Sequence, residues 1–280
     1  MGVGISILIN NAPTDFRGKV LATVIASFAL VSIIGMPAIL FLCTNYGWHV
    51  ALWLISTLCL LAVPLIVSMI PQDPVSFDTP SAPPFDMETL LFASSNALVQ
   101  FSPMLVIPIL VPLMTQLLGA SQDLLPWLFF AGGVSGYLST KITGALTSRI
   151  SALVLATGST LVFILSLLIP VLGYQHAALF ITLFLGASYS RLVSSSVVTI
   201  QFPDDRQRAG FSSLQTSIMY LITTVAFFLS AFLSPKNAIA PQNVNTLLAV
   251  CAISASGFPI IVIILQKKLA KRFHQSELRS

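Results

Sequence analysis

Long apolar stretches separated by short polar segments make up most of this sequence. A helix that crosses the hydrocarbon layer of a membrane needs about 20 mostly apolar residues. Eight stretches qualify: 19–43, 47–70, 88–118, 124–147, 150–173, 177–201, 209–233 and 244–266. Backbone polar groups cannot stay unpaired in lipid, and the roughly ten-residue alternating strands of membrane barrels are missing. We therefore predict an all-α membrane protein with eight full spans.

Composition supports the same class. Charged residues make up 8% of the chain and hydrophobic residues 56%, whereas a soluble domain carries about 25% charged residues. Cys43, Cys59 and Cys251 lie in apolar stretches, where we interpret them as small hydrophobic residues and expect no disulfide. No hydrolase motif, metal-ligand spacing or pair of intramembrane carboxylates is present in the sequence. We expect no enzyme activity, no cofactor or metal, and no nucleic-acid partner.

The basic residues predict the orientation. If the loop at residues 10–18 is cytoplasmic, eleven Lys and Arg residues fall on the inner side, only Lys236 falls on the outer side, and Arg191 lies within a span. Positively charged loops remain on the cytoplasmic side. We therefore predict a multi-pass protein of a bacterial cytoplasmic (inner) membrane with both termini in the cytoplasm.

Two similar polar loops indicate an internal repeat. The segments "NAPTDFRGKV" (10–19) and "QFPDDRQRAGF" (201–211) each place Pro, acidic residues, Arg and Gly before an apolar stretch. Their spacing fits six spans with loops, and parallel repeats place equivalent loops on one side of the membrane. The predicted parts are a remnant of a first six-helix bundle at 1–70, a cytoplasmic linker at 71–87, a complete C-terminal six-helix bundle at 88–266, and a basic cytoplasmic tail at 267–280.

Three segments carry a family resemblance. They are "GVGISILINNAPTDFRGK" (2–19), "GWHVALWLISTLCLLAVPLIVSMIP" (47–71) and "GALTSRIS" (144–151). With the repeat, they resemble the major facilitator superfamily, whose members have two six-span halves joined by a cytoplasmic loop. The resemblance implies a twelve-span helical bundle, of which this chain covers the end of span four through span twelve. It also implies a secondary transporter of a small solute by alternating access, incomplete as given.

The resemblance also implies gating loops. Arg17 and Gly18 belong to the first loop and Arg208 to its repeat. In "GALTSRIS", Gly144 and Arg149 match the family's loop motif. Ser148 replaces the motif's Asp, Ser151 replaces its Gly, and Ala152, the next residue, replaces its final basic residue. This departure favours a second reading, in which the chain is a non-transporting degenerate relative or a fragment of a transporter.

Arg191 is the most unusual residue of the spans. A charge near the middle of the bilayer is costly and usually faces a cavity or a partner. Ser188, Arg191, Ser195 and Thr199 share one helical face by their spacing. Arg191 and Ser195 are therefore candidates for binding a polar or anionic solute group. The alternative is a structural Arg bonded to backbone carbonyls between helices.

Two further spans carry candidate solute contacts. Asn96 and Gln100 lie one turn apart in the stretch that also holds three prolines, and broken helices often line substrate sites. In 209–233, Tyr220 falls on one predicted face with Ser213, Ser217 and Thr224. For both sets the alternative is ordinary packing and hydrogen bonding between helices.

No carboxylate lies deep in a predicted span. Proton-coupled transporters usually carry such a group, so proton coupling here would depend on Glu88 or Asp123 at a span end, or on spans outside this chain. The expected partners are a small solute of amphipathic or metabolite character, membrane lipids and, where transport is coupled, protons.

Overall fold

The chain is helical throughout the part that the computed structural model describes, which is residues 17–69, 86–203, 207–233 and 241–277. Side chains are described for these residues except 17–19, 69, 241–242 and 273–277. No strand is present in these ranges, which confirms the predicted all-α class. The predicted stub at 1–9, most of the linker at 71–87 and Arg206 lie outside the described residues.

The helices follow the predicted spans. In chain order they are α2 (Arg17–Leu30), η2 (Val31–Gly35), α3 (Met36–Tyr46), α4 (Trp48–Met69), α5 (Met87–Val106), η3 (Ile107–Ile109), α6 (Leu110–Pro112), η4 (Leu113–Leu117), η5 (Gln122–Leu124), α7 (Leu125–Leu146), α8 (Ala152–Val171), α9 (Ala177–Thr199), α10 (Arg208–Leu233), α11 (Pro241–Ser256) and α12 (Phe258–Glu277). Within the described residues, seven helical stretches are long and apolar enough to cross a membrane. The eighth predicted span, α7, has 22 residues, and its Gly, Ser, Thr and Lys content keeps it out of this apolar group.

Several long helices are interrupted near prolines. The third span passes from α5 through η3 and α6 into the π-helical η4, and its Pro residues are Pro103, Pro108 and Pro112. Proline has no N–H to donate and its ring crowds the preceding turn, which interrupts the α-helical bonding. The predicted discontinuity of this span is confirmed. A π-helical turn, η2, also precedes Pro37, and α11 gives way to α12 two residues before Pro259.

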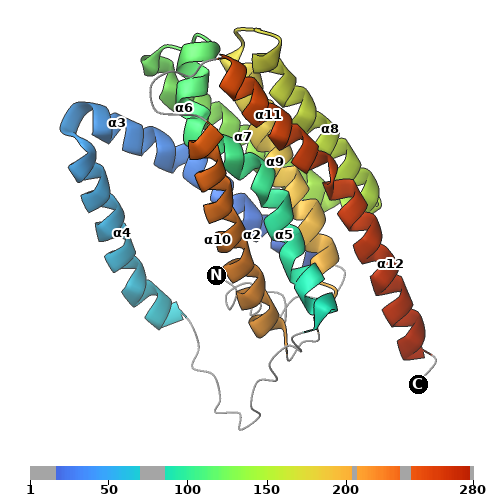
Figure 1. The fold of residues 1–280 in the computed structure, drawn as a ribbon. Helices are drawn as coiled ribbons and strands as arrows, with labels where there is room; N and C mark the ends of the chain where they lie inside the picture. The colour runs from blue at the N-terminus through green and yellow to red at the C-terminus, as the bar shows by residue number, and fades with distance from the viewer. Residues whose placement is uncertain (1–16, 70–85, 204–206, 234–240, 278–280) are drawn as a thin grey trace.

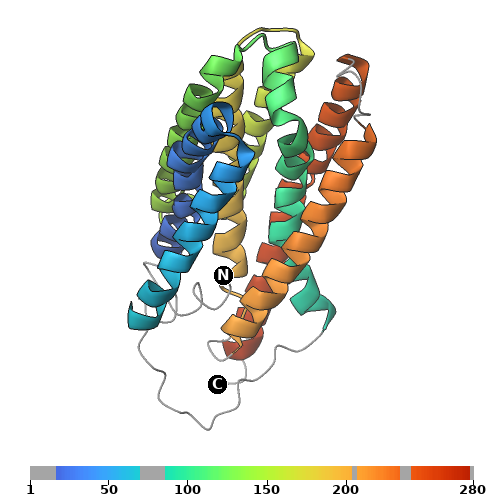
Figure 2. The same ribbon diagram turned by 90° about the vertical axis from the view of Figure 1, so that its left-hand side faces the viewer.

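α9 is the central helix of the bundle formed from α5 onward (Figures 1 and 2), and α5, α7, α8 and α12 pack on it. α9 packs along both α7 and α8, α10 runs along α5, and α11 and α12 cover α5 and α8. α2 packs against α7 and α9, whereas α4 packs mainly on α3 and stands apart from the other helices in Figure 1. α12 continues as helix through residues predicted as a tail, up to Glu277.

Glycines allow α7 to approach its neighbours closely. A Cβ at Gly132 would lie 2.8 Å from Ile181 and Leu185 of α9, and one at Gly136 would lie 2.5 Å from the Tyr189 ring. A Cβ at Gly133, on another side of α7, would lie 2.7 Å from the backbone nitrogen of Ile33 in η2. These glycines therefore permit a close approach of α7 to both α9 and η2. These contacts fix α2 and η2 beside α9, which places the elements of the site described next.

Candidate functional site

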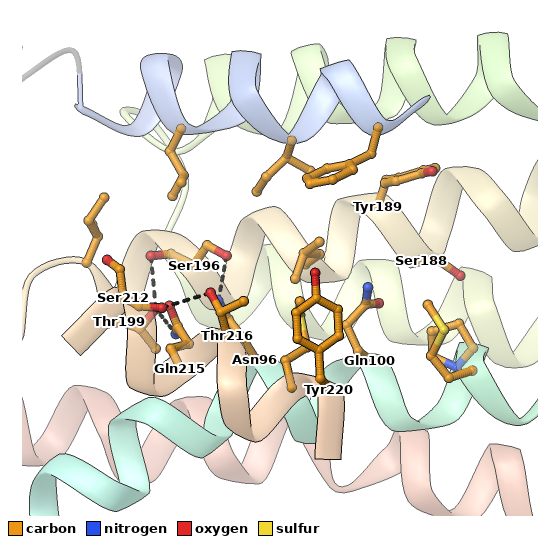
Figure 3. Close-up of a pocket in the computed structure, with 18 of the residues that line it drawn as sticks. Asn96, Gln100, Ser188, Tyr189, Ser196, Thr199, Ser212, Gln215, Thr216 and Tyr220 are labelled. Atoms are coloured by element: carbon orange, nitrogen blue, oxygen red, sulfur yellow. Dashed lines mark hydrogen bonds between the residues drawn. The ribbon is translucent and has the colours of Figure 1, made fainter. Parts of the chain in front are cut away.

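A cavity of about 330 Å³ lies between α2, α5, α9 and α10 (Figure 3). Ligand sites are usually concave, about 300–1,000 Å³ in volume, and mostly apolar with a few placed polar groups. This cavity fits that description. Its apolar lining includes Leu21, Ile25 and Phe28 of α2, Met104 of α5 and Phe184 of α9.

Asn96 and Gln100 of α5, which the sequence analysis named as candidate solute contacts, both line the cavity. They lie one turn apart, and Met104 continues the same row one turn further on. The Asn96 Nδ2 donates a hydrogen bond to the Ser196 Oγ of α9 at 3.0 Å, while its Oδ1 is buried and has no hydrogen-bond partner among the described residues. The Gln100 amide has no hydrogen-bond partner among these residues, so it is the amide that a solute can use.

On α9, the lining row differs from the predicted one. Ser188 and Thr199 line the cavity, while Arg191 and Ser195 are fully buried elsewhere, and Leu192 and Ser196 take their places. A shift of one residue turns a side chain by about 100° around a helix. Because α9 is buried on nearly all sides, polar spacing in its sequence cannot distinguish one row from the next.

On α10, Tyr220 lines the cavity at its exposed edge. Ser213, Ser217 and Thr224 lie on the same side of the helix but do not line the cavity. They are exposed, and the hydroxyls of Ser217 and Thr224 bond to carbonyls of their own helix. The other α10 residues of the lining are Arg208, Phe211, Ser212, Gln215, Thr216 and Met219.

Polar groups gather at one end of the cavity, near the end of α9 and the beginning of α10. Figure 3 shows Ser196, Thr199, Ser212 and Gln215 together there, with Tyr189 toward the opposite end. The Gln215 Nε2 donates to the Thr199 Oγ1 at 3.3 Å. Together with the bond from Asn96 to Ser196, this contact joins α5, α9 and α10 around the polar end.

Among the described residues, Arg208 is the one charged side chain that lines the cavity. It begins α10 and is 3% exposed. Of the other residues predicted to gate the protein, Gly144 is buried within α7 and Arg149 lies in the turn after it. Neither lines the cavity. Arg17 and Gly18 form the first turn of α2, and their side chains lie outside the described part.

Arg191 lies in the interior of the bundle. Its guanidinium carbon lies 4.6 Å from the centre of the Phe163 ring of α8 and 5.5 Å from that of Phe258 of α12. Arg191 does not line the cavity, so the structure does not bring it to the solute site. It does not bond to backbone carbonyls, because its three side-chain nitrogens have no hydrogen-bond partner among the described residues. Arg191 therefore lies in a part of the bundle that is separate from the cavity.

Sequence reasoning missed the wall formed by α2 and the contribution of Tyr189. No local pattern marks these residues, because they reach the cavity only when α2 packs on α7 and α9. Gln215 was also missed, although it lies one turn after Phe211 and one turn before Met219 in a row of α10 that lines the cavity.

The described residues contain no group of three or more His, Cys, Asp or Glu side chains that could hold a metal ion. The acidic side chains described, those of Asp86, Glu88 and Asp123, all lie at helix ends. Glu88 lies 3.8 Å from the Lys268 Nζ at the surface. The cavity thus supplies amides, hydroxyls, one guanidinium and apolar surface, which suits binding rather than bond-breaking chemistry.

Comparison with known proteins supports a transporter fold. A chloramphenicol resistance protein from Streptomyces lividans is 23% identical over 195 residues, which cover 67% of this chain and 50% of that protein. The chain thus spans about half the length of this curated relative. The crystal structure of a bacterial homologue of the iron transporter ferroportin, in its outward-facing state, matches 95% of this chain and 68% of its own, with a TM-score of 0.65 and 14% identity.

The family model that matches is that of the Major Facilitator Superfamily, over residues 1–226. The match covers most of the chain, and it agrees with the helical bundle and with the structural similarity. This chain is a multi-pass membrane protein that belongs to the Major Facilitator Superfamily.

Proposed function

We propose that this protein carries a small amphipathic solute across a bacterial cytoplasmic membrane by alternating access, with both termini in the cytoplasm. The observation that carries the proposal is the cavity of about 330 Å³, which is mostly apolar and contains the unpaired amide of Gln100. A solute with an apolar body and a few hydrogen-bonding groups fits such a lining.

The polar groups narrow the solute class. The Gln100 amide both donates and accepts hydrogen bonds. Arg208 favours an electron-rich group at the polar end, and none of the described carboxylates lines the cavity. A neutral or weakly anionic compound is therefore preferred. The name of the Streptomyces lividans relative makes chloramphenicol the first solute to test.

We further propose that additional helices close the cavity in the working transporter. Tyr220 lines the cavity and is nevertheless 61% exposed, so the wall formed by α10 is open at its side. Further along α10, Phe228 and Phe232 are each 74% exposed. Helices packed on this face would separate the solute from lipid, as the first six-helix half does in the family.

None of the described carboxylates lines the cavity, so a proton-coupling group among the described residues lies elsewhere. Glu88 is the candidate, because it lies in the first turn of α5 and faces Lys268 of α12. Protonation of Glu88 would remove that ion pair and its link between the two helices. A pH gradient is therefore included in the test.

The test is uptake of labelled chloramphenicol into proteoliposomes containing the full chain, with and without a pH gradient. Gln100→Leu removes the free amide from the lining at little change in volume, so we expect uptake to fall about tenfold, as for the loss of one or two hydrogen bonds. Ser213→Ala is the matched control, since Ser213 is exposed on the outer face of α10. Solute-specific uptake that is equal in both variants would contradict the assignment of the cavity.

A non-transporting relative is the second candidate. It is favoured by the altered loop around Arg149 and by the position of α4, which packs mainly on α3. It predicts no uptake of any amphipathic solute by the purified chain and no effect of solutes on its melting temperature. Stabilisation by a transported solute, lost in Gln100→Leu, would exclude it.

A further inference from the structure

Five buried side chains outside the solute cavity have polar atoms without a hydrogen-bond partner among the described residues: Thr89, Thr160, Arg191, Ser195 and Ser230. Of these, Arg191 and Ser195 of α9 and Thr160 of α8 lie in neighbouring turns of two packed helices. Arg191 and Ser195 are 0% exposed and Thr160 is 3% exposed. Buried polar atoms are nearly always paired, so each exception indicates a partner other than these side chains and their neighbours.

The aromatic contacts of Arg191 do not satisfy its donors. Phe163 and Phe258 meet the guanidinium through cation–π contacts, at 4.6 and 5.5 Å from its central carbon to the ring centres. Such contacts use the positive charge. The five N–H groups point outward in the guanidinium plane. They still require an acceptor in that plane.

No carboxylate among the described residues is in a position to neutralise this cation. The described acidic side chains are those of Asp86, Glu88 and Asp123, all at helix ends. An isolated charge in a low-dielectric interior is costly, and buried charges are normally paired. An anion bound from solution would supply both the negative charge and the missing acceptor.

The two hydroxyls lie on one side of Arg191 along the bundle. Ser195 follows Arg191 by one turn of α9, and Thr160 precedes Phe163, the ring that meets Arg191, by about one turn of α8. α8 and α9 are packed along each other and run in opposite directions. One turn forward on α9 and one turn back on α8 therefore lead toward the same end of the bundle.

We propose that Arg191 and Ser195, with Thr160 on the facing helix, bind a compact monovalent anion, for which chloride is the probe. The polar atoms of Arg191, Ser195 and Thr160 are closed to solvent in this structure. An ion therefore enters only with a shift of the neighbouring side chains, which limits the ligand to a monatomic or nearly monatomic ion. This site is separate from the solute cavity, whose lining contains none of the three residues. It gives the C-terminal bundle an anion-dependent stability that does not depend on which solute is carried.

The test is the melting temperature of the purified full chain in detergent, titrated with sodium chloride against sodium gluconate at constant ionic strength. A ligand that binds only the folded state raises the melting temperature in a saturable way. Bromide replaces chloride in a parallel titration, and its anomalous scattering locates the ion in crystals. We expect saturable stabilisation by both halides and a bromide peak beside Arg191.

Two variants separate this site from a general salt effect. Ser195→Ala removes one donor to the anion, so the chloride concentration for half-maximal stabilisation should rise about tenfold, as for one charge-assisted hydrogen bond. Ser194→Ala is the matched control, because Ser194 is equally buried on the same helix but donates to the Ser190 carbonyl at 2.9 Å. Its chloride dependence should equal that of the unchanged chain.

Arg191→Gln should abolish the effect of halide on the melting temperature. If Arg191→Gln does not fold, the comparison of Ser195→Ala with Ser194→Ala still decides the test. Identical melting curves in chloride and gluconate would overturn the proposal, as would a chloride effect that is the same in Ser195→Ala and Ser194→Ala. A crystal in bromide with a water molecule at Arg191 and no anomalous signal would overturn it as well.

Discussion

The contact between α7 and η2 offers the sharpest test of how the cavity is built. A Cβ added at Gly133 would lie 2.7 Å from both the Cγ1 and the backbone nitrogen of Ile33, and 2.9 Å from the carbonyl carbon of Ser32. Backbone atoms cannot rotate away as a side chain can. Gly133→Ala therefore has to push η2 and α2 away from α7, and α2 forms one wall of the cavity.

The expected change in the free energy of unfolding is the sum of two opposing effects. Replacing Gly by Ala inside a helix is favourable by about 0.5–1 kcal/mol, whereas overpacking a closely packed contact typically costs about 1–3 kcal/mol. At Gly158 of α8, a Cβ would meet nothing within 4 Å, so Gly158→Ala carries the favourable effect alone. The difference between the two variants isolates the packing cost, which we expect at about 1–3 kcal/mol.

The assay is unfolding of each purified variant in one detergent, followed by tryptophan fluorescence and by circular dichroism. Gly133→Ala should melt below the unchanged chain, and Gly158→Ala at or above it. Truncating Ile33 to Ala in the Gly133→Ala chain should restore only part of the loss, because the backbone contact remains. If Gly133→Ala were as stable as Gly158→Ala, the close approach of η2 to α7 would be refuted.

Two further predictions concern the ends of helices. Asp86 caps α5 by accepting a hydrogen bond from the Thr89 N–H at 2.8 Å, and bonds from Thr89 lower the pKa of this carboxyl. Asp86→Ala should therefore lower the free energy of unfolding by about 1 kcal/mol at neutral pH. In melts at decreasing pH this difference should shrink, because the carboxyl is protonated on passing below its lowered pKa. A difference that does not depend on pH would argue against the cap. The Arg272 guanidinium donates to the Phe202 carbonyl at 2.9 Å and lies 4.8 Å from the centre of the Phe202 ring. In denaturant titrations, Arg272→Gln should lower the free energy of unfolding by about 1–3 kcal/mol, and Arg272→Lys should recover part of that loss. Equal stability of Arg272→Gln and the unchanged chain would rule out this contact.

The sequence was sufficient for the class of fold and for the course of the helices. Long apolar stretches have few structural solutions in lipid, because only helices and closed barrels satisfy the backbone. Prolines also marked the discontinuous third span correctly, since their effect on a helix is local.

The faces of the helices were harder to predict. α5 presented Asn96 and Gln100 as expected, because two amides one turn apart in an apolar span need polar partners, which a cavity or a neighbouring helix supplies. α9 is surrounded by other helices and has polar residues on several faces. Of the row predicted from its sequence, Arg191 and Ser195 do not line the cavity. On α10, the exposed Ser217 satisfies its hydroxyl within its own helix, so a polar side chain there does not mark the cavity.

The most direct test of the central claim is whether a solute protects the cavity from chemical labelling. Gln100→Cys, in a chain whose three native cysteines are replaced by alanine, places a thiol in the lining, and Ser213→Cys places one on the outer face of α10. The labelling rate of each thiol with a small maleimide is measured with increasing chloramphenicol or another transported solute. We predict saturable protection at position 100 and none at position 213. Equal rates with and without a solute that the protein demonstrably transports, or equal protection at both positions, would contradict the assignment of this cavity as the solute site.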